Sequence, residues 1–207
     1  MAPYEFMNKN IAQALYRALT EDPFYISLEK NHGHSPEAAK EAMLQYYDYA
    51  MKEARSHGEL VVTPDGASGA GIWSLPPAND EDRAMVQKQG EQKKDFIKNH
   101  MGQDCLDTYN RIVDFMEEAA RDVVSDQFWY LSILGIDPEK QGLGLGRALM
   151  EPVLEKTDQL QTLVYIESFT PKNFEFYRSL GFAETKTIEE PLTESQYTIM
   201  IRRPRKI

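Results

Sequence analysis

The chain has 207 residues, a length typical of one domain that buries its core without disulfides or a structural metal. It is 42% hydrophobic and 27% charged, with a formal net charge of −10 and a single cysteine, Cys105. These values argue against a nucleic-acid-binding surface and a disulfide framework, and no stretch is apolar enough for a membrane span. Residues 1–10 lack the basic start and apolar run of a secretion signal, so we expect a cytoplasmic protein.

The first half of the chain predicts helices around one hairpin. Ser35-Pro36-Glu37 combines an N-cap, a first-turn proline and a first-turn acid, which together begin a helix. Asp22-Pro23 is expected to end the helix before it, and Pro64-Asp65-Gly66 is typical of a hairpin turn. The expected helices cover 8–19 and 35–57, the expected strands cover 59–63 and 69–75, and a helical insertion covers about 76–125.

The second half predicts a strand, a helix and a strand, which implies one parallel pair with a right-handed crossover. The expected strands cover 128–136, 162–168, 182–188 and 196–202, and the expected helices run from the glycines to about 156 and over 171–180. Pro152 is expected to kink the first of these helices. The fold class is therefore mixed α/β, with a mostly antiparallel sheet, a central parallel pair and flanking helices in a single domain, 1–207.

Alternating glycines lie where the strand 128–136 turns into a helix. The first N–H groups of a helix have no partner within the helix and lie at the positive end of its dipole. Gly142, Gly144 and Gly146 leave such donors uncovered, which indicates an anion site for a pyrophosphate. A P-loop is excluded because no Gly-Lys-Ser/Thr follows, and the alternation departs from the Rossmann G-x-G-x-x-G. A purely structural role, in a tight turn with close helix packing, is the remaining alternative.

The motifs resemble the Gcn5-related N-acetyltransferase (GNAT) superfamily. Gln141, Gly144 and Gly146 match its Q/R-x-x-G-x-G/A motif after Asp137-Pro138-Glu139, and residues 173–182 match its second motif, from Asn173 to Gly181-Phe182. Trp129-Tyr130-Leu131, residues 167–173 and Pro152 are most similar to the branch of puromycin acetyltransferase and many fungal relatives. The family's opening strand has at most a stub in residues 1–7.

The resemblance implies acetyl-coenzyme A (acetyl-CoA) as cosubstrate, held where the two parallel strands splay apart. The strands of that pair are the fourth and fifth when an opening strand is counted. Leu134, Gly135 and Ile136 correspond to the main chain that pairs with the pantetheine arm, and Asn173 and Phe176 to residues that bind and pack beside it. The implied pyrophosphate site consists of Gln141, Gly142, Leu143, Gly144, Leu145, Gly146 and Arg147.

The same resemblance implies two catalytic residues. Tyr177 matches the tyrosine that donates a proton to the departing thiolate, with a purely packed tyrosine under Gly181-Phe182 as the alternative, and the Ile136 N–H matches the donor to the thioester oxygen. Glu167, near the carboxyl end of its strand, is a general base, a recognition group for a cationic acceptor, or a strand-end glutamate in solvent.

The predicted function is acetyl-CoA-dependent acetylation of a small, cationic amine by direct attack. The alternatives are acetylation of a protein or peptide, and a coenzyme A-binding module without turnover. No nucleic-acid or membrane partner is expected, and the sequence gives no oligomeric state. His32, His34, His57 and His100 have no companions for a metal site, so no metal is expected, and Cys105 is interpreted as a small buried residue.

Overall fold

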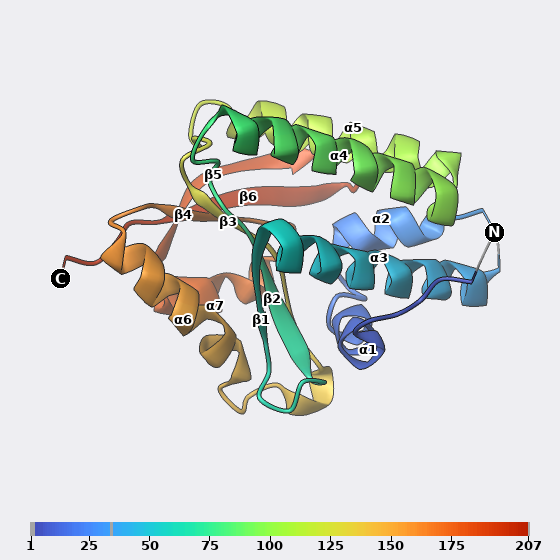
Figure 1. Cartoon of the computed structure of the whole chain (residues 1–207), viewed down its shortest axis with the longest axis horizontal. Helices are drawn as coiled ribbons and strands as arrows, with labels where there is room; N and C mark the ends of the chain where they lie inside the picture. The colour runs from blue at the N-terminus through green and yellow to red at the C-terminus, as the bar shows by residue number, and fades with distance from the viewer. Residues whose placement is uncertain (1–2, 34, 207) are drawn as a thin grey trace.

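A computed structural model describes residues 3–33 and 35–206 as a six-stranded sheet between two layers of helices (Figure 1). The strands are β1 (Gly58–Val62), β2 (Gly69–Ser74), β3 (Trp129–Ile136), β4 (Val164–Ser168), β5 (Phe182–Glu190) and β6 (Ser195–Arg202). The helices are α1 (Lys9–Ala18), α2 (Pro23–Lys30), α3 (Pro36–His57), α4 (Asp80–Met101), α5 (Gln103–Ala120), α6 (Leu145–Gln159) and α7 (Phe174–Ser179), with the short 3-10 turns η1 (Pro138–Lys140) and η2 (Pro171–Asn173).

The sheet has the order β1-β2-β3-β4-β6-β5, and β3 and β4 are its parallel pair. The other neighbours are antiparallel, so the predicted mixed α/β class is confirmed. The parallel strands are third and fourth rather than fourth and fifth, because residues 3–7 form no strand. The amino-terminal strand that the resemblance includes is therefore absent from the described residues.

Strand alternation divides the core between the two faces of the sheet. Ile72 packs with α1 and α3, whereas the next residue, Trp73, packs with α6 and α7 on the other face. Helix α5 covers β6 on the same side as α1 and α3, since Ile112 packs against Tyr197. In Figure 1, α4 and α5 lie together above the sheet and α6 lies below it.

Asp22-Pro23 begins a helix that the sequence analysis did not predict. The Asp22 side chain accepts a hydrogen bond from the Phe24 N–H, and Pro23 occupies the first turn of α2. The dipeptide thus starts the next helix instead of ending the first one, which already ends at Ala18. The predicted start at Ser35 is confirmed by its side-chain cap on Ala38, and α6 runs through Pro152 without ending.

Single residues singled out in the sequence also have structural positions. Cys105 is buried, with its Sγ 3.1 Å from the Leu28 carbonyl oxygen, as predicted. His34 lies outside the described residues, and within them no group of His, Cys, Asp and Glu is arranged to hold a metal ion. None of the helices in the described ranges is both long and apolar enough to cross a membrane.

Arg202, at the end of β6, is a buried part of the fold. Its side chain is 2% exposed and makes two hydrogen bonds of 2.7 Å with the carboxylate of Asp158 in α6. Its Nε also donates to the Leu180 carbonyl oxygen at 3.0 Å, so one guanidinium joins β6, α6 and the end of α7. These hydrogen bonds lower the pKa of Asp158.

We expect Asp158→Asn to destabilise the protein by about 3 kcal/mol, because it leaves the buried Arg202 charge without its counter-ion. Urea unfolding measures the change. Glu184→Gln is the matched control, since it breaks the more exposed ion pair with Arg178 and should cost less than about 1 kcal/mol. Equal losses of stability in the two variants would show that the buried Asp158–Arg202 pair is no more important than an exposed one.

Candidate active site

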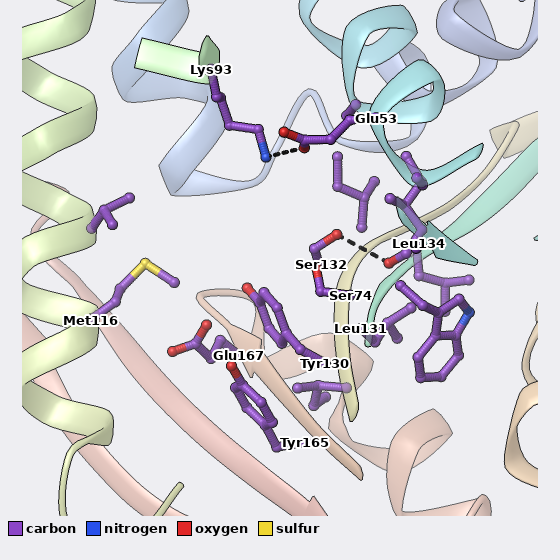
Figure 2. A pocket seen from close by; sticks show the side chains of 18 of the residues that line it. Glu53, Ser74, Lys93, Met116, Tyr130, Leu131, Ser132, Leu134, Tyr165 and Glu167 are labelled. Carbon is purple, nitrogen blue, oxygen red and sulfur yellow. Dashed lines mark hydrogen bonds and ion pairs between the residues drawn. The ribbon is translucent and has the colours of Figure 1, made fainter. Parts of the chain in front are cut away.

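A cavity of about 720 Å³ lies between the sheet and the helical layer formed by α2 to α5. Its sheet wall comes from residues 72–74 of β2, 130–134 of β3 and 165–168 of β4, and its far wall comes from α4 and α5. Asn173 and Tyr177 line it from the segment that follows β4. Figure 2 shows this cavity with Met116 of α5 across from Glu167 of β4.

The cavity forms where β3 and β4 stop pairing. Their parallel ladder covers only Trp129 to Leu131 of β3, although β3 continues to Ile136 beside β2. A bulge at Ser132 shifts the β2–β3 register at the same point. Residues 132–136 therefore have a strand on one side only, and the splay that the resemblance implies is confirmed.

The free edge of β3 presents main-chain groups of Leu134 and Ile136. The Asp137 N–H donates to the Ser68 carbonyl oxygen of the neighbouring hairpin at 2.8 Å. Because main-chain groups alternate between the two edges of a strand, the N–H groups of Ile136 and Leu134 point away from β2. The Ile136 carbonyl oxygen accepts a hydrogen bond from the Gln141 side chain at 3.1 Å, which ties the glycine turn to the strand end.

Gly135 has a different role from its two neighbours. By the same alternation its main chain faces β2. A Cβ at this position would lie 2.7 Å from Leu15 Cδ2 and 3.2 Å from Ala18 Cβ. The glycine is thus required for the close approach of α1 to β3.

The glycine turn leaves a run of N–H groups uncovered. Gly142 and Gly144 adopt φ values of 79° and 78°, and a Cβ on either would meet no atom within 4 Å. Helix α6 has no side-chain cap, and among the described residues no acceptor is recorded for the N–H groups of 142–147. These residues include Leu143 and Leu145, whose N–H groups belong to the same run. The turn therefore offers several donors to an anion.

Four predicted binding residues lie around this turn, and each has its own contacts. A Cβ at Gly146 would lie 3.3 Å from Phe176 Cζ, so this glycine allows α6 to pack against α7. Asn173 is exposed at the cavity, and no hydrogen bond is recorded for its side-chain amide within the described residues. Arg147 contacts Glu151 and Ser179 at 3.3 and 3.2 Å rather than projecting free into solvent.

Tyr177 is both a packed residue and a lining residue. Its side chain packs edge-to-face on Phe182, with the ring centroids 5.9 Å apart, and it is 9% exposed. It also borders the cavity together with Asn173. Burial raises the pKa of Tyr177, and the nearby Asp22 raises it further, so the hydroxyl is protonated at neutral pH.

Glu167 lies in the cavity wall among tyrosines, so its interpretation as a strand-end residue in solvent is wrong. The Tyr197 hydroxyl donates to its carboxylate. Burial raises the pKa of Glu167, and hydrogen bonds from Tyr197 and Tyr130 partly offset that rise. Tyr130 stacks on Tyr165 at a centroid distance of 4.6 Å, and Figure 2 shows the two rings beside Glu167.

The sequence analysis missed the polar residues on the far side of the cavity. Lys93 of α4 and Glu53 of α3 form an ion pair of 2.5 Å there (Figure 2). Neither residue belongs to a motif, and only the tertiary packing of α3 against α4 brings them together. The place of Tyr165 beside Glu167 could be predicted from the sequence, because residues two apart in a strand lie on the same face.

Comparisons with known proteins agree with this fold. The family model described as "Acetyltransferase (GNAT) domain" matches residues 105–184. An uncharacterized N-acetyltransferase of Schizosaccharomyces pombe is 25% identical over 201 residues, which cover 95% of this chain and 79% of the relative.

Two solved structures match almost the whole chain. A Corynebacterium glutamicum structure described as histone acetyltransferase HPA2 and related acetyltransferase has a TM-score of 0.60 and 16% identity, covering 99% of this chain and 96% of that one. Mosquito arylalkylamine N-acetyltransferase like 5b has a TM-score of 0.56 and 14% identity, covering 94% of each chain.

The fold and these matches define an acyltransferase. The splayed parallel strands, the glycine turn at the start of α6 and the second motif in α7 occur together in one chain that matches acetyltransferases in sequence and in structure. Residues 105–184 match the acetyltransferase domain of the GNAT superfamily, whose members generally use acetyl-CoA as cosubstrate. The branch within the superfamily stays a prediction.

We expect Tyr197→Phe to raise the pKa of Glu167, because the hydroxyl that donates to the carboxylate favours its charged form. Carboxyl carbon NMR of protein labelled at glutamate measures the titration, and Glu167→Gln identifies the signal. Tyr49→Phe is the control, since Tyr49 stacks on Phe96 instead and should leave that titration in place. An unchanged or lowered pKa of Glu167 in Tyr197→Phe would show that the Tyr197 hydroxyl does not stabilise the charged carboxylate.

Proposed function

We propose that this protein transfers the acetyl group of acetyl-CoA to the amine of a small, cationic molecule by direct attack. The observation that carries the proposal is the continuity of the site. The open edge of β3 at Leu134 and Ile136 lies between the uncovered N–H groups of 142–147 and the cavity that contains Tyr177 and Glu167.

The residues present fit acetyl-CoA. Gly142 and Gly144 direct no side chain into the turn, so a pyrophosphate can approach the N–H groups closely. We assign Gln141 to closing this turn on β3 and Arg147 to a phosphate, which requires it to leave Glu151. The N–H and C=O groups of Leu134 pair with the pantetheine arm beside Gly135, Asn173 binds that arm through its amide, and Phe176 packs beside it.

When bound, acetyl-CoA supplies a thioester whose carbonyl carbon accepts the amine. The Ile136 N–H donates to the carbonyl oxygen and stabilises the charge that develops there. The C–N bond forms and the C–S bond breaks, while Tyr177 gives its hydroxyl proton to the departing sulfur. The attacking nitrogen loses a proton to Glu167, and solvent then reprotonates Tyr177 and deprotonates Glu167.

Glu167 suits the role of base because burial raises its pKa. The same carboxylate, with the faces of Tyr130 and Tyr165 nearby, also suits recognition of a cationic amine. The two roles are compatible when an ammonium group held at Glu167 first loses one proton through Glu167 to solvent. The carboxylate is then free to take the second proton of the nitrogen during transfer.

We further propose that α4 and α5 form an insertion in the single domain, at about residues 76–125, that builds the acceptor pocket. Both helices line the cavity, and α4 closes it through the Lys93–Glu53 ion pair. Support for a small amine comes from the arylalkylamine acetyltransferase with a similar fold and from the net charge of −10.

Release of free thiol tests this function. The protein is incubated with acetyl-CoA and a panel of small primary amines, with lysine-containing peptides as a parallel arm. Thiol release above the hydrolysis rate with an amine supports the proposal, whereas release with peptides alone contradicts the small-amine acceptor. Tight coenzyme A binding without release in either arm would make the protein a binding module instead.

We expect Tyr177→Phe to lower kcat about 100-fold, because the departing thiolate loses its proton donor. The dissociation constant for coenzyme A should change little, since Phe keeps the packing on Phe182. Steady-state kinetics and calorimetry measure the two effects separately. Turnover equal to that of the parent at every pH would show that Tyr177 is not the acid.

We expect Gly144→Val to abolish coenzyme A binding in calorimetry. Valine is strongly disfavoured at the φ of 78° that this position requires, so the turn must rearrange and its N–H groups lose their alignment. Gly102→Val is the matched control, because Gly102 has a φ of 98° in the connection of α4 to α5, away from the turn. Loss of binding in both variants would point to a general effect of strain.

A further inference from the structure

The turn between α1 and α2 contacts the segment after β4 that carries the proposed catalytic tyrosine. Three contacts of different chemistry lie side by side: an ion pair, a hydrogen bond and a pair of stacked rings. They join Glu21 to Lys172, Asp22 to Thr170, and Phe24 to Phe169, and the two segments run in opposite directions.

Thr170 is the member of this contact that is also hydrogen-bonded to Asn173. Its Oγ1 donates to Asp22 Oδ2 at 3.0 Å, and its carbonyl oxygen accepts from the Asn173 N–H at 3.0 Å. The second bond closes η2, which leads directly into α7 and Tyr177. The position of Thr170 therefore influences where the side chains of Asn173 and Tyr177 are placed.

Asp22 is a rigid anchor for Thr170. Its other oxygen, Oδ1, accepts from the Phe24 N–H at 3.0 Å as the N-cap of α2, so the carboxylate is fixed by its own helix. Asp22 also lines the cavity with Asn173 and Tyr177, close enough to influence the ionisation of Tyr177. Burial raises the pKa of Asp22, and the hydrogen bonds from Thr170 and from the main chain of α2 oppose that rise, so these bonds favour the charged form of the carboxylate.

We propose that Asp22 is a positioning residue of the acetyl-transfer site, which acts through the Thr170 hydroxyl to place Asn173 for cosubstrate binding and Tyr177 for proton donation. This inference rests on the proposed function. It gives the amino-terminal helices a role in the chemistry that none of the sequence motifs indicates.

The test compares Thr170→Val with the parent protein, because valine keeps the shape of threonine and removes only the hydroxyl. We expect kcat to fall about tenfold or more, since small displacements of a reacting group are costly in rate. The dissociation constant for coenzyme A should rise as Asn173 shifts, while KM for the amine stays the same. Thr170→Ser, which keeps the hydroxyl, should restore both values.

Glu21→Gln is the matched control from the same contact. It breaks the exposed ion pair with Lys172, and we expect kcat within about twofold of the parent, because exposed pairs contribute little. Should Thr170→Val fail to fold, as judged by circular dichroism, Asp22→Asn replaces it, since asparagine also caps a helix but weakens the bond to Thr170. We expect the same fall in kcat from that variant.

Two results would overturn the inference: parental kcat and coenzyme A affinity in Thr170→Val, or an equal loss in the valine and serine variants. Failure of the proposed function looks different. In that case the parent itself releases no thiol with any amine, whereas failure of the inference leaves the parent active and the variants unchanged or unrescued.

Discussion

The early end of the β3–β4 ladder is the constraint on which the rest of the site depends. Parallel strands normally bury their main-chain groups against each other along their whole length. Here pairing stops at Leu131, so Leu134 and Ile136 keep donors and acceptors that the sheet does not use. The Ser132 bulge in the β2–β3 pairing lies at the point where the β3–β4 ladder ends, and a bulge bends its strand locally. Unpaired main-chain groups next to a cavity need a ligand or solvent to satisfy them, which is consistent with the proposed pairing of the open edge with the pantetheine arm.

The glycine turn extends the same principle to the start of α6. Positive φ at Gly142 and Gly144 turns the chain so that consecutive N–H groups have no acceptor among residues 3–33 and 35–206. Contacts of the residues just before the glycines hold the turn in place. The Gln141 side chain donates a hydrogen bond to the end of β3, and the Asp137 side chain caps η1. Arg17 of α1 forms an ion pair with Asp137. A rigid set of donors is effective for anion binding because no ordering cost is incurred when the anion arrives.

The sequence predicted the parts of this protein that depend on local backbone chemistry. The glycines, the Ser35 cap and the Asp65 turn are local, and the structure contains the elements that they indicate. Helix α2 was missed because it has only eight residues and its Asp-Pro start also serves as a stop signal. The surroundings of Glu167 were beyond local patterns, since Tyr197 lies in β6 and reaches Glu167 only through the sheet order. The Lys93–Glu53 pair needed the packing of α4 on α3, which no motif specifies.

This division follows the chemistry of the two halves of the site. The half assigned to the cosubstrate is made largely of main-chain groups, which can be arranged only by residues with special φ values or small size, and such residues leave a recognisable pattern. The half assigned to the acceptor is made of side chains from α3, α4, α5 and the strands. Many residue types can fill such positions equally well, so these side chains leave no recognisable sequence pattern. Substitutions in the acceptor half are therefore expected to leave the turn undisturbed, provided that the segment carrying Asn173 and Tyr177 stays in place. Anchoring that segment on the α1–α2 turn, outside both halves, separates the position of the proposed acid from the identity of the amine.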